Sequence, residues 1–309
     1  MSDPMASYLT RRLLIAVAVL FTISLISFLL LKLSGDLATA LAGEGSNAAY
    51  VEFLRKEYGL DRPLVVQYAS WLGKALTGDF GRSFYFNDSV SLLFASRLLV
   101  TLKLGVLSIL LALLVALPLG VLAALREGSW VDRLVQMLAL TGQAMPVFWS
   151  SYLLILLFAV NLGWLPISGA DSLAHLALPA CALALNALPA LLRITRSGMS
   201  EALVSDYVRT ARAKGLRMHS VVFKHALRNA LVPLVAIAAV QFGLLLGGSV
   251  VVETIFAVDG IGYFTWQAIS QNDYPVVQAA VLIVSSFYVL LTLASDLLNM
   301  WIDPRYKID

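Results

Sequence analysis

The chain has 309 residues, of which 60% are hydrophobic and 13% are charged, and its mean hydropathy is +0.83. A soluble domain needs roughly a quarter charged residues to cover its surface, so this composition argues against a soluble protein and favours an integral membrane protein. The small net charge of +3 argues against a polyanion-binding protein, and the single cysteine, Cys181, excludes an internal disulfide and a cysteine-rich metal site.

The first apolar run covers residues 13–31, LLIAVAVLFTISLISFLLL, and follows Arg11 and Arg12. Its length suits a membrane-spanning helix, which takes about 20 residues. A cleaved signal peptide is the alternative, but its apolar core would be shorter, about 7–15 residues, and an Ala-x-Ala-like site would follow. We favour a retained first span, so that residues 1–31 form a cytoplasmic start and the first transmembrane helix.

Residues 32–97 are mixed in charge and contain two amphipathic pieces, AAYVEFLRKEYGL and PLVVQYASWLGKAL. In the second piece, apolar and aromatic residues recur at helical spacing. These residues are Leu64, Tyr68, Trp71, Leu72 and Ala75. The pattern predicts an extramembrane helical segment that rests on the membrane surface.

Five further apolar blocks bring the predicted number of spans to six. They cover residues 98–125, 133–160, 174–197, 230–253 and 276–302. The loops 161–173 and 254–275 contain no Lys or Arg, whereas the other short connections and the tail 303–309 do. Because positively charged loops stay in the cytoplasm, we expect both termini to be cytoplasmic and residues 32–97 to lie outside. The sequence thus predicts an all-α integral membrane protein with a five-helix core at 98–302, which includes a cytoplasmic loop at 198–229.

The most unusual segment of that loop, residues 207–229, holds six Lys or Arg and no acid. Val208, Ala211, Gly215, Met218 and Val222 form one stripe of a helix, since their spacings are 3, 4, 3 and 4. Glycine is unfavourable inside a helix, so Gly215 indicates a turn between two short helices or a close approach to another backbone. We interpret the segment as a docking element for a partner. A helix lying on anionic lipid and a plain cytoplasmic loop are the alternatives, and nucleic-acid binding is disfavoured because no aromatic platform accompanies the charges.

Catalytic and cofactor motifs are missing from the sequence. It has no G-x-x-x-x-G-K-[ST] loop, so we do not expect it to bind ATP. His175, His219 and His225 do not have the spacing of a helical zinc pair, and no catalytic set of side chains stands out. We therefore expect a protein that is not an enzyme and holds neither a metal nor a cofactor of its own.

Polar residues inside the apolar blocks are candidates for a translocation pathway. They are Gln143, Ser150, Asn186 and Gln241. Polar groups at membrane depth usually face the protein interior or a water-filled path, although a hydrogen bond between two helices is the alternative. Glu253 and Asp296 lie near span ends, and the sequence assigns no partner to either.

The segment RTARAKG (Arg209–Gly215) resembles the cytoplasmic signature E-A-A-x-x-x-G of permease subunits of bacterial ABC importers. Ala211 and Gly215 match it, whereas Arg209 and Thr210 stand where the signature has Glu and Ala. Further stretches along the whole chain are similar to the dipeptide/oligopeptide/nickel branch of that family. They are YGLDRPLVVQY, GDFGRSF, DYVRTARAKG, HALRNALVP, GGSVVVETIF, GIGYF, DYPVVQA and DPR.

The resemblance implies a multi-pass permease of the bacterial cytoplasmic membrane that imports di- or oligopeptides. It also implies these partners: a second permease, two cytoplasmic ATPase subunits that bind the ATP, and an extracytoplasmic solute-binding protein. The ATPase-coupling helix would comprise Tyr207, Val208, Arg209, Thr210, Ala211, Arg212, Ala213, Lys214, Gly215, Leu216 and Met218. Nickel, a metal–chelator complex, glutathione or an opine remain alternative substrates, and a stand-alone secondary transporter or channel is the alternative from another class.

Overall fold

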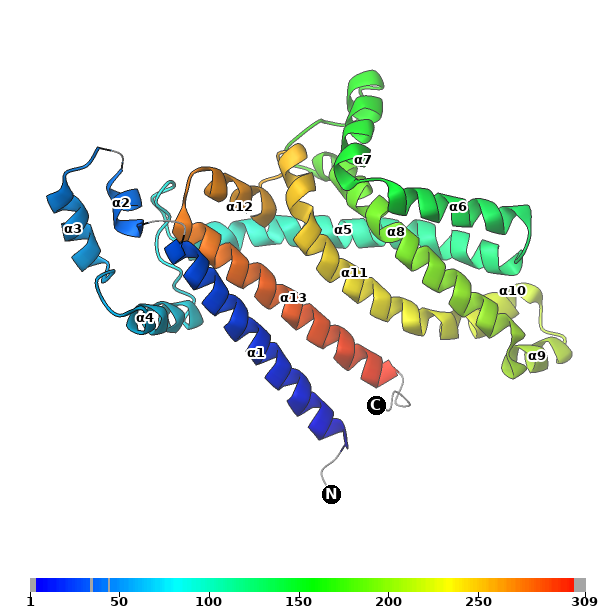
Figure 1. The fold of residues 1–309 in the computed structure, drawn as a ribbon. Coiled ribbons are helices and arrows are strands. Elements are labelled where there is room, and N and C mark those ends of the chain that lie inside the picture. Colours follow the sequence, from blue (N-terminus) through cyan, green and yellow to red (C-terminus); the bar gives the residue numbers. More distant parts are fainter. Residues whose placement is uncertain (1–3, 34–35, 44, 303–309) are drawn as a thin grey trace. The chain divides into compact units, whose positions relative to one another are not determined.

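The computed structural model describes residues 4–33, 36–43 and 45–302, and the regular structure in them is helical, with no named strand (Figure 1). The predicted all-α class is therefore confirmed. Contacts within the chain divide it into two compact units. One contains the chain up to Leu99 together with Gly260–Val289, and the other contains Val100–Asp259 together with the chain from Leu290 onward.

The first unit contains the helices of the predicted outer segment, the helices next to it in the sequence, and two helices near the end of the chain. They are α1 (Pro4–Leu33), α2 (Leu37–Ala42), α3 (Ala48–Glu57), α4 (Leu64–Leu76), the start of α5 (Val90–Leu125), α12 (Ile261–Ser270) and the start of α13 (Tyr274–Ile302). Helix α4 is the second predicted amphipathic piece. Its Tyr68 ring contacts Phe21 and Phe28 of α1, and the Tyr68 hydroxyl lies 2.7 Å from Ser24 Oγ. The aromatic stripe of α4 therefore covers part of α1, a contact that the sequence did not predict.

Asp273, directly before α13, organises the loop that leads into α5. Its carboxylate accepts hydrogen bonds from the Ser83 hydroxyl and from the backbone N–H groups of Phe84 at 3.2 Å and Tyr85 at 3.3 Å. The segment 254–275, expected as a loop, also contains a helix, α12, whose Phe264 is fully buried.

The second unit contains the remainder of α5 and the helices that carry most of the polar candidates. They are α6 (Trp130–Ala144), α7 (Val147–Leu154), the π-helical turn η1 (Ile155–Asn161), α8 (Leu173–Val204), α9 (Asp206–Ala213), α10 (Met218–Ser220), the π-helical turn η2 (Val221–Ala226) and α11 (Leu227–Ile255). Helix α8 packs against α6, α7 and α11 (Figure 1).

Glycines allow the helices of this unit to approach closely, as is common between membrane helices. A Cβ atom on Gly120 of α5 would lie only 2.7 Å from the Thr195 Cβ of α8. One on Gly142 of α6 would lie 3.3 Å from the Leu185 carbonyl oxygen of α8. The contacts of α8 with α5 and α6 are therefore possible only because Gly120 and Gly142 have no side chain.

Within the part of the chain that the structure describes, five helices are long and apolar enough to cross a membrane, and a bent pair of helices would make a sixth span. The five candidate spans are Thr10–Leu30, Val90–Leu125, Leu173–Val204, Met218–Ile255 and Tyr274–Ala294. The predicted block 133–160 is not one straight helix. It breaks at Met145 and Pro146, and α6 meets the α7–η1 pair at 103°. Proline disfavours helical backbone in the preceding residue, and Met145 is accordingly extended, with φ −81° and ψ 121°.

The linear division into 1–31, 32–97, 98–302 and 303–309 describes topology across a membrane, and it stays a prediction. By contacts, the segments up to Leu99 belong with Gly260–Val289 rather than standing apart. The predicted cytoplasmic tail 303–309 lies outside the described residues.

Candidate functional site

The basic loop after α8 folds as a helix, a turn and a second helical segment. Helix α9 ends at Ala213, and Gly215 follows with a left-handed φ of +75°. The Gly215 N–H donates to the Arg212 carbonyl at 2.9 Å, and the Leu216 N–H donates to the Ala211 carbonyl at 3.3 Å. This pair of hydrogen bonds is the Schellman arrangement, which favours glycine at its left-handed position. The predicted turn at Gly215 is confirmed.

The apolar stripe of the predicted docking element is, in large part, buried within this chain. Val208 is fully buried, Ala211 is 5% exposed and Val222 is 3% exposed, whereas Gly215 and Met218 are exposed. The expectation that the whole stripe forms the docking face is therefore wrong. The chain's own helices already cover its first two members and Val222, so Val208 and Ala211 anchor α9 rather than contact a partner.

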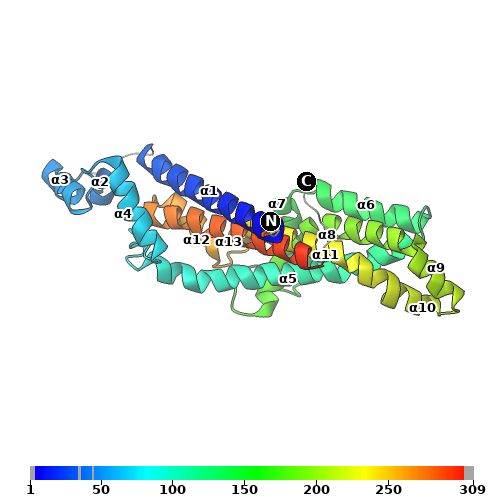
Figure 2. The same ribbon diagram turned by 90° about the horizontal axis from the view of Figure 1, so that it is seen from below.

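The cluster beneath α9 joins the ends of several long helices. Its buried members are Val121 and Ala124 of α5, Met199 and Ala202 of α8, Val208 and Ala211 of α9, Val221, Val222 and Ala226 of η2, and Ala230 of α11. Both views place α9 and α10 together at one end of α8 (Figure 1 and Figure 2). Because this cluster is closely packed, a displacement of α9 must shift the helix ends that it contacts.

The remaining residues of the predicted coupling helix form an exposed surface, which we call the α9 face. It comprises Tyr207, Arg209, Thr210, Arg212, Ala213, Lys214, Gly215, Leu216 and Met218. Three cations lie among the apolar side chains of Tyr207, Leu216 and Met218, of which Tyr207 is 43% and Met218 is 50% exposed. Arg209 lies 3.3 Å from Asp206, but both side chains are largely exposed, so this ion pair contributes little. The α9 face thus combines positive charge with uncovered apolar area.

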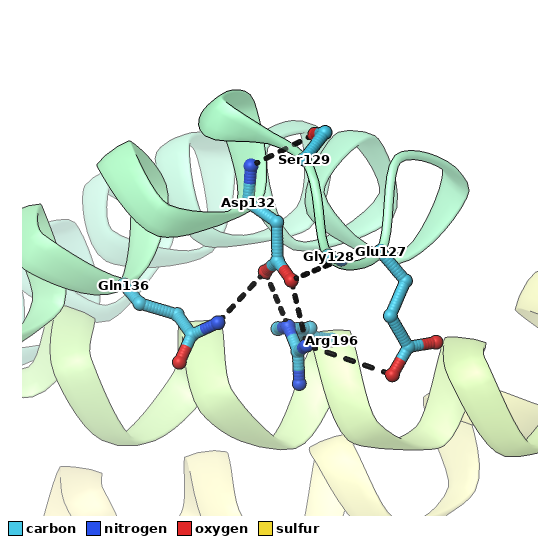
Figure 3. A network of polar contacts seen from close by, with 6 residues as sticks. All are labelled: Glu127, Gly128, Ser129, Asp132, Gln136 and Arg196. Atoms are coloured by element: carbon cyan, nitrogen blue, oxygen red, sulfur yellow. Dashed lines mark hydrogen bonds and ion pairs between the residues drawn. The ribbon is translucent and has the colours of Figure 1, made fainter.

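A buried charge pair fastens α6 to α8, and Figure 3 shows its partners. Arg196 of α8 donates to the Asp132 carboxylate of α6 from Nε at 2.6 Å and from Nη2 at 2.8 Å. The carboxylate also accepts from the Gly128 N–H at 3.0 Å and from Gln136 Nε2 at 2.9 Å. The Asp132 side chain is only 3% exposed, so this network satisfies a charge that would otherwise be costly to bury.

Neither Arg196 nor Asp132 was singled out from the sequence. A usable signal was present, because Ser129-x-x-Asp132 resembles the polar capping pattern at the start of a helix. The structure shows this cap, in which the Asp132 N–H donates to Ser129 Oγ at 3.4 Å.

The four candidate pathway residues lie in different surroundings. Gln143 of α6 and Asn186 of α8 are exposed, and each follows a residue of the close Gly142–Leu185 contact. Gln241 of α11 is half-buried. Ser150 is 4% exposed, and its hydroxyl donates to the Val147 carbonyl of its own helix at 2.9 Å. The structure therefore places Gln143 and Asn186 beside the contact between α6 and α8, and Ser150 in the packed interior.

Glu253 of α11, for which the sequence assigned no partner, is fully buried. It accepts a hydrogen bond from the Thr101 hydroxyl of α5 at 2.8 Å. Among the described residues, no group of three or more His, Cys, Asp or Glu is placed to hold a metal ion.

Comparison with known proteins identifies the family of this chain. The sequence profile described as "Binding-protein-dependent transport system inner membrane component" matches residues 116–308, and the profile of the N-terminal part of the same membrane component matches residues 5–105. A Brucella abortus protein, named as a permease of a peptide transport system, is 42% identical over 314 residues, covering 99% of this chain and 100% of that protein. A Salmonella paratyphi A protein, named as a glutathione transport system permease, is 42% identical over 306 residues, covering 98% of this chain and 100% of that protein.

A solved structure of the methionine ABC transporter MetNI, in an inward-facing conformation, has a similar fold. The TM-score is 0.58 at 20% identity, and the match covers 68% of this chain and 96% of that chain. This likeness concerns the fold alone.

The profiles and the full-length relatives establish a multi-pass protein of the cytoplasmic membrane that acts as the permease component of an ABC importer and works with other subunits of it. The chain belongs to the family of inner membrane components of binding-protein-dependent transport systems.

Proposed function

We propose that this permease pairs with a second, similar permease to form the translocation pathway of a di- or oligopeptide importer. Two ATPase subunits would bind and hydrolyse the ATP, and an extracytoplasmic solute-binding protein would deliver the substrate. The names of the full-length relatives support this substrate class, since they include a peptide permease and a glutathione permease, and glutathione is itself a tripeptide. The chain would contribute no catalytic group and no cofactor.

The single observation that carries the coupling role is the two-sided construction of α9. One side, at Val208 and Ala211, is buried against the ends of other helices of the same unit. The opposite side is the α9 face, which is basic and partly apolar. A helix built in this way transmits a partner's movement into the helices beneath it. Its cations would guide docking by charge complementarity, which affects register and association rate more than affinity.

Charge reversal tests the docking role. In the reconstituted transporter, we expect Arg212→Glu combined with Lys214→Glu to weaken ATPase association and to abolish ATP-driven uptake. Arg126→Glu is the matched control, because Arg126 is exposed after α5 and does not belong to the α9 face. Wild-type uptake and subunit retention in the Arg212/Lys214 variant would refute docking at this face.

Substrate class and energy source are tested together in proteoliposomes that contain the purified transporter and its binding protein. We expect uptake of labelled di- and tripeptides that requires ATP. Labelled glutathione and Ni²⁺ in the same assay test the alternative substrates. A thermal shift of the binding protein with each ligand identifies the substrate independently. Solute movement by this chain alone, without ATP or other subunits, would instead indicate a stand-alone transporter or channel.

A further inference from the structure

A cavity of about 870 Å³ lies within the first unit, between α1, α4, the loop before α5 and the start of α13. Its volume is within the range of about 300–1,000 Å³ that is typical of ligand sites. Phe28 and Lys32 contribute from α1, and Pro275 and Gln278 contribute from α13. None of these residues belongs to the α9 face or to the candidate pathway.

Two buried amide atoms in the wall of this cavity have no hydrogen-bond partner among the described residues. Gln278 is only 6% exposed, and its Nε2 donor is unpaired. The Nε2 group of Gln67 donates to the carbonyl oxygens of Leu60 at 3.0 Å and Arg62 at 2.7 Å, which leaves its buried Oε1 as an unpaired acceptor. Unpaired buried polar atoms are rare, because each costs the free energy of its lost hydration. The wall therefore offers one donor and one acceptor to a ligand.

The charged residues that line the cavity are predominantly positive. They are the cations Lys32, Arg62, Lys74 and Arg82 and the single acid Asp79. Asp79 already accepts a hydrogen bond from the Gly81 N–H at 2.9 Å. Arg62, Lys74 and Arg82 form no ion pair with any residue in the described part of the chain. Burial lowers the pKa of Lys32, although the nearby Asp36 carboxylate counteracts this effect. An anion in the cavity would compensate these charges.

The ends of two candidate membrane spans lie beside this cavity, where the headgroups of a surrounding bilayer are expected. The apolar span of α1 ends at Leu30, two residues before Lys32, and the candidate span of α13 begins at Tyr274, next to Pro275. Tyr58 and Trp71 also line the cavity, and such aromatic residues are enriched at membrane–water interfaces. A ligand that enters at this level can therefore come from the bilayer itself.

We propose that this cavity binds the headgroup of an anionic phospholipid of the phosphatidylglycerol class. The phosphate would accept hydrogen bonds from Gln278 and be neutralised by Lys74 and Arg82, while a headgroup hydroxyl would donate to Gln67 Oε1. The acyl chains would extend along the apolar surface of α1. The site would tie the extramembrane helices to the bilayer, and it is independent of which substrate the importer carries.

The test uses the full-length chain, purified with the subunits that accompany it, and measures thermal shifts on titration with short-chain lipids. We expect dihexanoyl-phosphatidylglycerol to raise the unfolding temperature and dihexanoyl-phosphatidylcholine to have no effect. Because each basic residue near an anionic lipid surface contributes a binding factor of about 5, Lys74→Gln combined with Arg82→Gln should weaken binding by about 25-fold. Lys56→Gln is the matched control, since Lys56 is an exposed cation of α3 that does not line the cavity.

A second variant and a second measurement distinguish a loss of lipid binding from misfolding. Gln278→Leu keeps the approximate size of the side chain and removes the donor, and native mass spectrometry counts the phosphatidylglycerol molecules that each variant retains. Fewer retained lipids in Gln278→Leu and in the double variant than in Lys56→Gln would support the proposal. Equal retention in all variants would overturn it, as would an equal shift with phosphatidylcholine. A shift with inorganic phosphate or a tripeptide that matches the phosphatidylglycerol shift would also overturn it, because it would assign the site to a free anion or to a peptide.

Discussion

The guanidinium of Arg196 donates two hydrogen bonds to the carboxylate of Asp132, and this pair joins α8 to α6 at the buried start of α6. Two parallel hydrogen bonds fix the relative orientation of the groups as well as their separation. Helix α8 also leads directly into the loop that carries α9. Any force that reaches α8 from α9 is therefore shared with α6.

Replacing the acid of this pair should destabilise the protein. We expect Asp132→Asn to lower the unfolding free energy by about 1–3 kcal/mol, because Arg196 would lose its charged partner while remaining partly buried. Glu127→Gln is the control, since Glu127 lies 3.6 Å from Arg196 with 58% of its side chain exposed, and we expect a change below about 0.5 kcal/mol. Thermal unfolding in detergent measures both, and equal losses in the two variants would contradict the assigned role of Asp132.

The anchoring side of α9 should tolerate no added volume. We expect Ala211→Leu to cost about 1–3 kcal/mol of stability through overpacking and to reduce ATP-driven uptake. The neighbouring Ala213 is exposed, so Ala213→Leu should leave stability nearly unchanged. A uniform response of both variants in thermal unfolding would mean that α9 is not packed as described.

The left-handed backbone at Gly215 should tolerate some replacement side chains better than others. Gly215→Ala places a Cβ at φ +75° and should cost about 1 kcal/mol, although nothing else crowds this position. Asparagine tolerates this conformation better, so Gly215→Asn should retain more of the coupling between ATP hydrolysis and uptake than Gly215→Ala. The ratio of ATP hydrolysed to peptide transported measures the difference, and the reverse order would exclude a conformational cause.

The contact between α5 and α8 should depend on the absence of one methyl group. A Cβ on Gly120 would meet the Thr195 Cβ at 2.7 Å, whereas a Cβ on Gly247 of α11 would meet nothing within 4 Å. We expect Gly120→Ala to destabilise the protein by about 1–3 kcal/mol because α5 and α8 would have to separate. Gly247→Ala should be neutral or slightly stabilising, and thermal unfolding separates the two outcomes. If Gly120→Ala were as stable as Gly247→Ala, α5 and α8 could separate to accommodate the methyl group without loss of stability.

Much of the fold could be predicted because the pattern of apolar residues reflects local requirements. The lengths of the apolar blocks other than 133–160 predicted the long helices, and glycine at position 215 indicated the turn. The break at Met145 and Pro146 could not be singled out from the sequence, since hydropathy does not report the direction of a helix. Proline alone was no sufficient signal, because Pro118, Pro179, Pro189 and Pro233 all lie inside continuous helices.

The candidate site could be predicted only in part. A helical stripe shows which residues share a face, but it does not show what covers that face. Val208 and Ala211 were therefore assigned to a partner, although this chain's own helices bury them. The Asp132–Arg196 pair joins residues 64 positions apart in the sequence, and only the packing of α6 on α8 brings them together.

The bend between α6 and α7 has a consequence for the assembled transporter. Helix α6 has 15 residues, and at about 1.5 Å per residue it is roughly 22 Å long, less than the hydrocarbon thickness of about 30 Å. The chain therefore changes direction before it could have crossed. Backbone outside a helix cannot face lipid, because its polar groups would lack partners there. Pro146 is exposed and Met145 half-buried in the single chain. With this corner inside the bilayer, we expect a neighbouring subunit of the complete importer to cover it or water to reach it.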